Sequence, residues 1–130
     1  MSDRICLVVD DEPAVRRYVC VVLQKDNYQT LEAESAPQAL KLIKAMNGGL
    51  DLLITDISMP GDMDGADLAF AVRNAFPTVP IVVISGYASS AWVKSGMKDF
   101  EFIEKPFKPE AISMAVVRAT TSAGLPPGPS

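Results

Sequence analysis

Apolar residues occur along this chain in short continuous runs that alternate with segments of helical periodicity. The runs at 5–9, 51–55 and 80–84 are almost wholly apolar, as is typical of strands buried on both faces of a parallel sheet. Those at 28–33 and 100–103 contain more polar residues, which is typical of edge strands. Between the runs, apolar residues at i, i+3, i+4 and i+7 predict helices that face a core. We expect helices from 12–13 to 25, from 36 to about 47, and over 66–75, 89–95 and 109–121.

The ends of the first two helices also have sequence signals. Asp11 precedes Pro13 and is a candidate N-cap of the first helix, and Ser35 is a candidate N-cap of the second. The periodicity of the first helix predicts that five residues face the core: Val15, Tyr18, Val19, Val22 and Leu23.

Strand and helix alternate five times, which predicts an α/β fold with helices on both faces of a parallel sheet. With right-handed crossovers and the polar strands at the edges, the strand order is 2-1-3-4-5. This is the doubly wound, flavodoxin-like arrangement with five strands and five helices. We expect one domain over residues 1–121 and a disordered tail over 122–130, which is rich in Gly and Pro.

Composition narrows the functional classes. The chain has 130 residues, 48% of them apolar and 22% charged, and a formal charge of −4. The acidic balance argues against a nucleic-acid or membrane surface, and no apolar run approaches the length of a membrane span. We expect a cytoplasmic protein, because no signal peptide is visible and Cys6 and Cys20 look like core thiols. Histidine is absent, so histidine-based acid–base chemistry is excluded.

Polar side chains follow four of the predicted strands. Asp10 and Asp11 follow the first strand and Asp56 follows the third, while Ser85 and Lys105 come after the fourth and fifth. Taken singly, each could be a helix cap, a turn residue or a surface lysine. Because the carboxyl ends of parallel strands share one edge of the sheet, we expect all five to lie together.

This set of residues suits phosphoryl chemistry. Three neighbouring carboxylates repel one another unless a cation lies among them, and a few carboxylates with open water positions favour Mg²⁺ over Ca²⁺. A lysine and a serine hydroxyl would add positive charge and a donor for phosphoryl oxygens. Asp56 is the best candidate nucleophile, because it stands alone at the end of a central strand.

The sequence resembles the receiver domain of two-component response regulators. The matching pieces are Val8-Val9-Asp10-Asp11-Glu12, Ile54-Thr55-Asp56-Ile57-Ser58-Met59-Pro60 with Asp64-Gly65, Ile84-Ser85-Gly86, and Lys105-Pro106-Phe107. The resemblance implies that Asp56 accepts a phosphoryl group from a histidine kinase or a histidine phosphotransfer protein. It implies that Asp10, Asp11, Asp56 and the backbone carbonyl of Ser58 hold Mg²⁺, and that Ser85 and Lys105 contact the phosphoryl oxygens. It also implies a cis Lys105-Pro106 bond, and catalysis confined to the domain's own phosphorylation and dephosphorylation.

The resemblance implies a signalling surface as well. Ser85 and Phe102 are the expected switch residues, although Phe102 stands where a tyrosine is more usual and fits a core role at least as well. The family commonly signals through the face formed here by 89–95, 100–103 and 109–121. Met114 and Val117 lie off the predicted core stripe of the last helix, so we expect them, with Trp92, to contact a second copy or a downstream effector. Close packing of these side chains inside the domain is the alternative.

Two other functions fit part of the pattern. A phosphatase of the haloacid-dehalogenase type uses similar residues, but it needs a second Asp two positions after the nucleophile, where this chain has Ser58. A pseudo-receiver would bind partners without phosphorylation, and the complete residue set argues against it. No output domain is apparent, so we expect a receiver that stands alone or one cut from a longer chain.

Overall fold

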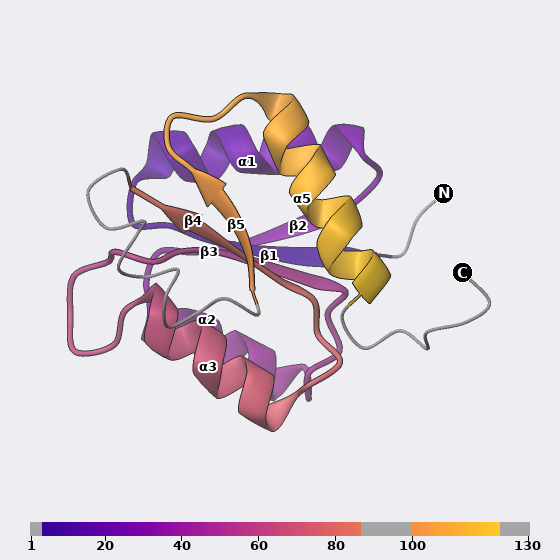
Figure 1. Ribbon diagram of the computed structural model, residues 1–130. Coiled ribbons are helices and arrows are strands. Elements are labelled where there is room, and N and C mark those ends of the chain that lie inside the picture. The colour runs from indigo at the N-terminus through magenta and orange to yellow at the C-terminus, as the bar shows by residue number, and fades with distance from the viewer. Residues whose placement is uncertain (1–3, 87–99, 123–130) are drawn as a thin grey trace.

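A five-stranded parallel sheet forms the centre of the computed structural model, which describes residues 4–86 and 100–122 (Figure 1). The strand order is β2-β1-β3-β4-β5, so the predicted topology is confirmed. The strands are β1 (Ile5–Val9), β2 (Gln29–Ala33), β3 (Leu52–Asp56), β4 (Ile81–Ser85) and β5 (Glu101–Glu104). The described residues form four helices: α1 (Pro13–Lys25), α2 (Ala36–Ala45), α3 (Gly65–Ala75) and α5 (Pro109–Ser122). The helix expected at 89–95, which contains Trp92, lies outside the described residues, as does the tail after residue 122.

The two faces of the sheet bury separate apolar clusters. Leu7 and Val9 of β1 point into the cluster under α2 and α3, whereas Cys6 and Val8 point into the cluster under α1 and α5. Figure 1 shows the two helix pairs on opposite faces of the sheet. This alternation explains why the central strands are apolar at every position, since both of their faces are covered.

Two predictions about α1 are wrong. Its N-cap is Glu12, whose side chain makes no cap hydrogen bond, and not Asp11; the Glu12 N–H instead donates to Asp10 Oδ1. Tyr18 is 39% exposed and stacks on Phe107 with ring centroids 5.8 Å apart, while Cys20 is buried. Tyr18 lies at the edge of the apolar stripe of α1, and the ring of Phe107, from the loop after β5, covers it only in part.

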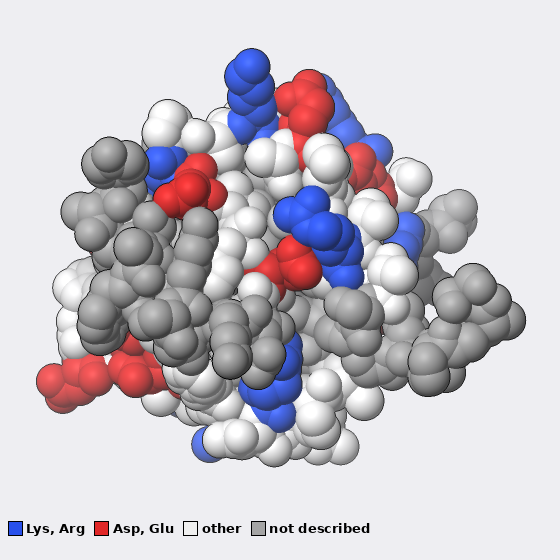
Figure 2. All heavy atoms as spheres, in the orientation of Figure 1, with Lys and Arg blue, Asp and Glu red and all other residues white. Residues whose placement is uncertain are grey.

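Other local predictions are confirmed. The Ser35 hydroxyl accepts from the Gln38 N–H and caps α2. Cys6 and Cys20 are buried free thiols, and the core stripe of α5 is buried at Ile112, Ala115, Val116 and Ala119. Within the described residues, no helix has both the length and the apolar character that a membrane span requires. Figure 2 shows acidic and basic side chains interspersed over the described part of one face, with no continuous basic patch there.

Candidate functional site

Strand pairing brings the predicted residues to one edge of the sheet. Asp56 and Ser85 are the last residues of β3 and β4, one position later than the predicted strand ends, because the ladders continue through the pairs Asp56 with Ile84 and Ser85 with Glu104. Asp10 and Asp11 follow β1 directly, and Lys105 follows β5. Since all five strands are parallel, these residues share the carboxyl edge of the sheet, as the sequence predicts.

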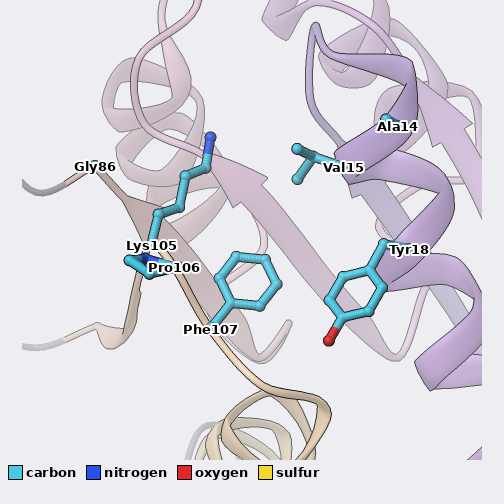
Figure 3. A pocket seen from close by; sticks show the side chains of 7 residues that line it. All are labelled: Ala14, Val15, Tyr18, Gly86, Lys105, Pro106 and Phe107. Carbon is cyan, nitrogen blue, oxygen red and sulfur yellow. The ribbon is translucent and has the colours of Figure 1, made fainter.

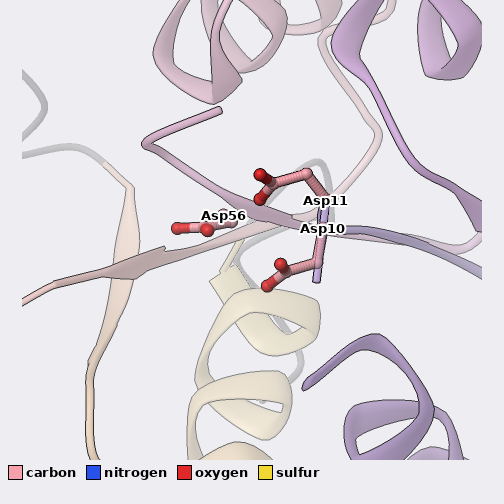
Figure 4. A group of neighbouring side chains, drawn as sticks. All are labelled: Asp10, Asp11 and Asp56. Atoms are coloured by element: carbon pink, nitrogen blue, oxygen red, sulfur yellow. The ribbon is translucent and has the colours of Figure 1, made fainter. Parts of the chain in front are cut away.

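Three carboxylates form an acidic cluster at this edge (Figure 4). One oxygen each of Asp10, Asp11 and Asp56 lies within 4.8 Å of the others. Asp10 is 1% exposed and Asp56 is 3% exposed, while Asp11 is exposed. Burying two like charges so close together is unfavourable without a compensating cation.

Asp10 has most of its polar groups satisfied. Its N–H donates to the Ala33 carbonyl at 3.2 Å, and its Oδ1 accepts from the Glu12 N–H at 2.9 Å. Its Oδ2 is buried and has no hydrogen-bond partner among the described residues. Burial raises the pKa of Asp10 to about 6; the carboxylates of Asp56 and Asp11 act in the same direction, against the Glu12 N–H and the Lys105 charge.

Lys105 supplies a positive charge next to the cluster. Its Nζ lies 3.3 Å from Asp56 Oδ2 and 3.4 Å from Glu12 Oε1. Burial raises the pKa of Asp56 above its ordinary value, although the Lys105 ammonium opposes this shift. Partial burial lowers the pKa of Lys105, but the carboxylates of Asp56 and Asp10 more than offset this, so its pKa is raised and it stays charged.

Glu12 belongs to the matching piece after β1, but the sequence predicted no role in the site for it. It looked like part of the helix start, and nothing local indicates that it pairs with a lysine 93 residues away.

The Asp64-Gly65 piece has a clearer signal in the sequence. A Cβ at Gly65 would lie 1.7 Å from the Asp56 carbonyl oxygen, and the Gly65 N–H donates to the Ile57 carbonyl at 2.8 Å. Only glycine lets the loop return so closely over the end of β3.

The remaining predicted residues differ in their surroundings. The Ser58 N–H donates to Asp56 Oδ1 at 3.4 Å, so this loop lies against the Asp56 carboxylate. Ser85 is buried at the same edge, and its hydroxyl donates to the Gly86 carbonyl at 3.1 Å. Phe102 is partly buried against the cluster under α2 and α3, and the Lys105-Pro106 peptide bond is cis, as predicted.

A family comparison decides what this arrangement is. The family model for the response regulator receiver domain matches residues 6–117. The chain belongs to this family. The matched residues include the whole edge of the sheet at which Asp10, Asp56, Ser85 and Lys105 lie.

Curated relatives and solved structures agree with this assignment. The receiver is 34% identical to the sensor kinase CckA of Brucella abortus over 85% of this chain and 12% of that protein. It is 33% identical to the nitrogen assimilation regulatory protein NtrX of Azorhizobium caulinodans over 92% of this chain and 26% of that protein. The chain thus spans no more than about a quarter of either relative. The receiver domain of NtrX from Brucella abortus superposes with a TM-score of 0.81 at 32% identity, covering 90% of this chain and 98% of that one.

A hollow with mostly apolar walls opens beside Lys105 of the receiver (Figure 3). The stacked rings of Tyr18 and Phe107 line it, together with Val15 on α1 and the aliphatic part of the Lys105 stem. Lys105 lines the hollow and also pairs with Asp56, so a surface that covers the hollow would come close to Asp56.

The described residues of the acidic cluster fit a divalent cation. The buried Asp10 Oδ2 lacks a donor, and Asp11 and Asp56 each offer a carboxylate oxygen nearby. All three ligand atoms are hard oxygens, the type that Mg²⁺ prefers. The exposed position of Asp11 leaves room for water in the remaining coordination positions.

Proposed function

We propose that this receiver is a phosphorylation-controlled switch in which Asp56 accepts a phosphoryl group. The observation that carries the proposal is the placement of the Asp56 carboxylate. It is buried, shares a cluster with Asp10 and Asp11, and lies 3.3 Å from Lys105 Nζ. Burying a carboxylate beside two others at the end of a central strand is unfavourable in itself, so we infer that its charge is used chemically.

The transfer forms one bond and breaks another. An oxygen of the Asp56 carboxylate attacks phosphorus in line as the N–P bond of a phosphohistidine breaks, and the released imidazole takes a proton from solvent. The product is an acyl phosphate on Asp56. During the transfer negative charge spreads over the equatorial phosphoryl oxygens. The Lys105 ammonium would stabilise that charge, and Ser85 would donate to one of the same oxygens.

Asp10, Asp11, Asp56 and the backbone carbonyl of Ser58 would hold Mg²⁺ in this proposal. Bound there, the ion would neutralise the clustered carboxylates and the incoming phosphoryl oxygens. The orphaned Asp10 Oδ2 supports this assignment, because a cation would satisfy it. The domain would catalyse only its own phosphorylation and dephosphorylation. Membership of the receiver family argues against the haloacid-dehalogenase type of phosphatase.

We propose a histidine kinase or a histidine phosphotransfer protein as the donor, acting in the cytoplasm. The buried reduced thiols of Cys6 and Cys20 fit a reducing compartment. A donor that delivers its phosphohistidine to Asp56 would cover the hollow formed by Tyr18 and Phe107. Tyr18→Glu should therefore slow transfer from a protein donor and leave labelling by acetyl phosphate unchanged. Equal slowing with both donors would contradict this docking site.

The output surface is proposed on α5. Met114 and Val117 are 60% and 61% exposed, more than the other large apolar side chains that are exposed among the described residues, and they lie one turn apart on α5. We propose that they contact a second copy or a downstream effector, with Phe102 and Ser85 transmitting the change from Asp56. Trp92, the third residue predicted for this contact, lies outside the described residues.

Intact mass spectrometry with acetyl phosphate tests the proposed chemistry. With Mg²⁺ present, the wild-type protein should gain the mass of one phosphoryl group. Chelation of Mg²⁺ should remove most of that gain, and dilution into buffer without acetyl phosphate should let it decay by hydrolysis. No mass gain in the presence of Mg²⁺ would contradict the proposal that this receiver is phosphorylated.

A further inference from the structure

Arg16 on the first turns of α1 joins three parts of the chain near the acidic cluster. Its Nη1 donates to the Asp10 carbonyl oxygen at 2.7 Å, and its Nε donates to Glu32 Oε1 on β2 at 2.8 Å. The Arg16 side chain is only 16% exposed, and Glu32 is partly exposed. The planar guanidinium makes both bonds from two nitrogens held in a fixed plane, a geometry that the single ammonium of a lysine does not reproduce.

These bonds complete the fixation of Asp10. Its N–H is bound by the Ala33 carbonyl and its Oδ1 by the Glu12 N–H, and its own carbonyl is bound by Arg16. Only Oδ2 is left without a partner among the described residues, and the carboxylate to which it belongs lies in the cluster with Asp11 and Asp56. The orientation of the Asp10 carboxylate therefore depends on a stretch of backbone that the hydrogen bond from Arg16 holds in place.

We infer that Arg16 is a positioning residue for the cation site, oriented by Glu32, and this inference rests on the proposed function of the acidic cluster. Arg16 touches neither a phosphoryl group nor the cation. It holds the Asp10–Asp11 turn in the geometry that lets both carboxylates reach one ion. Partners that orient metal ligands from outside the coordination shell commonly change metal affinity by roughly tenfold to a hundredfold.

Calorimetric titration of Mg²⁺ into the folded, unphosphorylated protein at pH 7.5 tests this role. Arg16→Met should weaken Mg²⁺ binding by roughly tenfold or more. Glu32→Gln should weaken it in the same direction but less, because the guanidinium stays and loses only its anchor. Arg17→Met is the matched control, since Arg17 is the next residue and is exposed. It should bind Mg²⁺ within about twofold of wild type.

The double variant separates positioning from general damage. If Glu32 acts through Arg16, then Arg16→Met with Glu32→Gln should bind Mg²⁺ no more weakly than Arg16→Met alone. A lower melting temperature with unchanged Mg²⁺ affinity in Arg16→Met would overturn the inference, because it would show a purely structural role. Should Arg16→Met not fold, wild-type affinity in Glu32→Gln would overturn it in the same way. Failure of the wild type itself to bind Mg²⁺ would instead refute the proposed cation site, and this inference with it.

Discussion

The two ends of β3 each carry an aspartate, and the two residues have opposite surroundings. Asp51, just before the strand, is exposed, and its Oδ2 accepts from the Ile5 N–H at 2.8 Å. Asp56, the last residue of the strand, is buried beside Asp10 and opposite Lys105. The first carboxylate satisfies a backbone donor and keeps its contact with water. The second is desolvated among like charges, an unfavourable placement that the proposed role in phosphoryl transfer explains.

The largest effect that sharpens this comparison is expected at Lys105. Lys105→Ala should slow labelling by acetyl phosphate roughly a hundredfold, because a fixed positive charge near the transferring group is lost. Lys108→Ala removes an equal charge from an exposed position three residues on, and it should label at the wild-type rate. Time courses of intact mass measure both. Equal rates in the two variants would show that Lys105 has no role in the transfer.

The next effect concerns the metal. Asp11→Ala should weaken Mg²⁺ binding by roughly tenfold or more, since a proposed carboxylate ligand is lost. The melting temperature of the metal-free protein should rise or stay the same, because repulsion within the cluster falls. Asp62→Ala carries the same change of net charge in an exposed loop and should alter neither quantity. Unchanged Mg²⁺ affinity in Asp11→Ala, measured by calorimetry, would exclude Asp11 as a ligand.

A smaller effect is expected from pH. The pKa of Asp10 is raised by burial to about 6 from an ordinary value of 3.8, so between these pH values the folded state binds more protons than the unfolded state. The contribution of Asp10 to the free energy of unfolding is complete below pH 3.8 and is lost as pH rises through about 6. Without Mg²⁺, Asp10→Asn should therefore gain stability relative to wild type as pH rises from 5 to 7. Urea unfolding at pH 5 and at pH 7 measures this difference in stability. Equal changes in the free energy of unfolding of both proteins would contradict the raised pKa of Asp10.

The smallest effect on stability is expected on α5, away from both ends of β3. Met114→Glu with Val117→Glu should abolish any self-association or effector binding and change the free energy of unfolding by no more than about 0.5 kcal/mol per site. Both side chains are more than half exposed, so little packing is lost. Light scattering and thermal unfolding follow the two properties. Unfolding of the domain by these substitutions would place the residues in the core and refute the proposed surface.

The sequence predicted those features that depend on local pattern. Continuous apolar runs identified the buried strands, and the polar residues after them identified Asp10, Asp56 and Lys105, because parallel strands bring their carboxyl ends to one edge. The exposure of Tyr18 and the pairing of Glu12 with Lys105 were missed. Both depend on the loop after β5, which is distant in the sequence from α1. The prediction that Asp11 is the N-cap of α1 was wrong for a local reason, because Asp10 rather than Asp11 accepts the Glu12 N–H.

The most direct test of the central claim uses the two aspartates of β3 as a matched pair. Asp51→Asn and Asp56→Asn make the same chemical change at opposite ends of one strand. With acetyl phosphate and Mg²⁺, Asp51→Asn should gain one phosphoryl group as the wild type does, despite losing some stability. Asp56→Asn should gain none while remaining folded. A phosphoryl gain of wild-type extent in folded Asp56→Asn would show that the acceptor lies elsewhere.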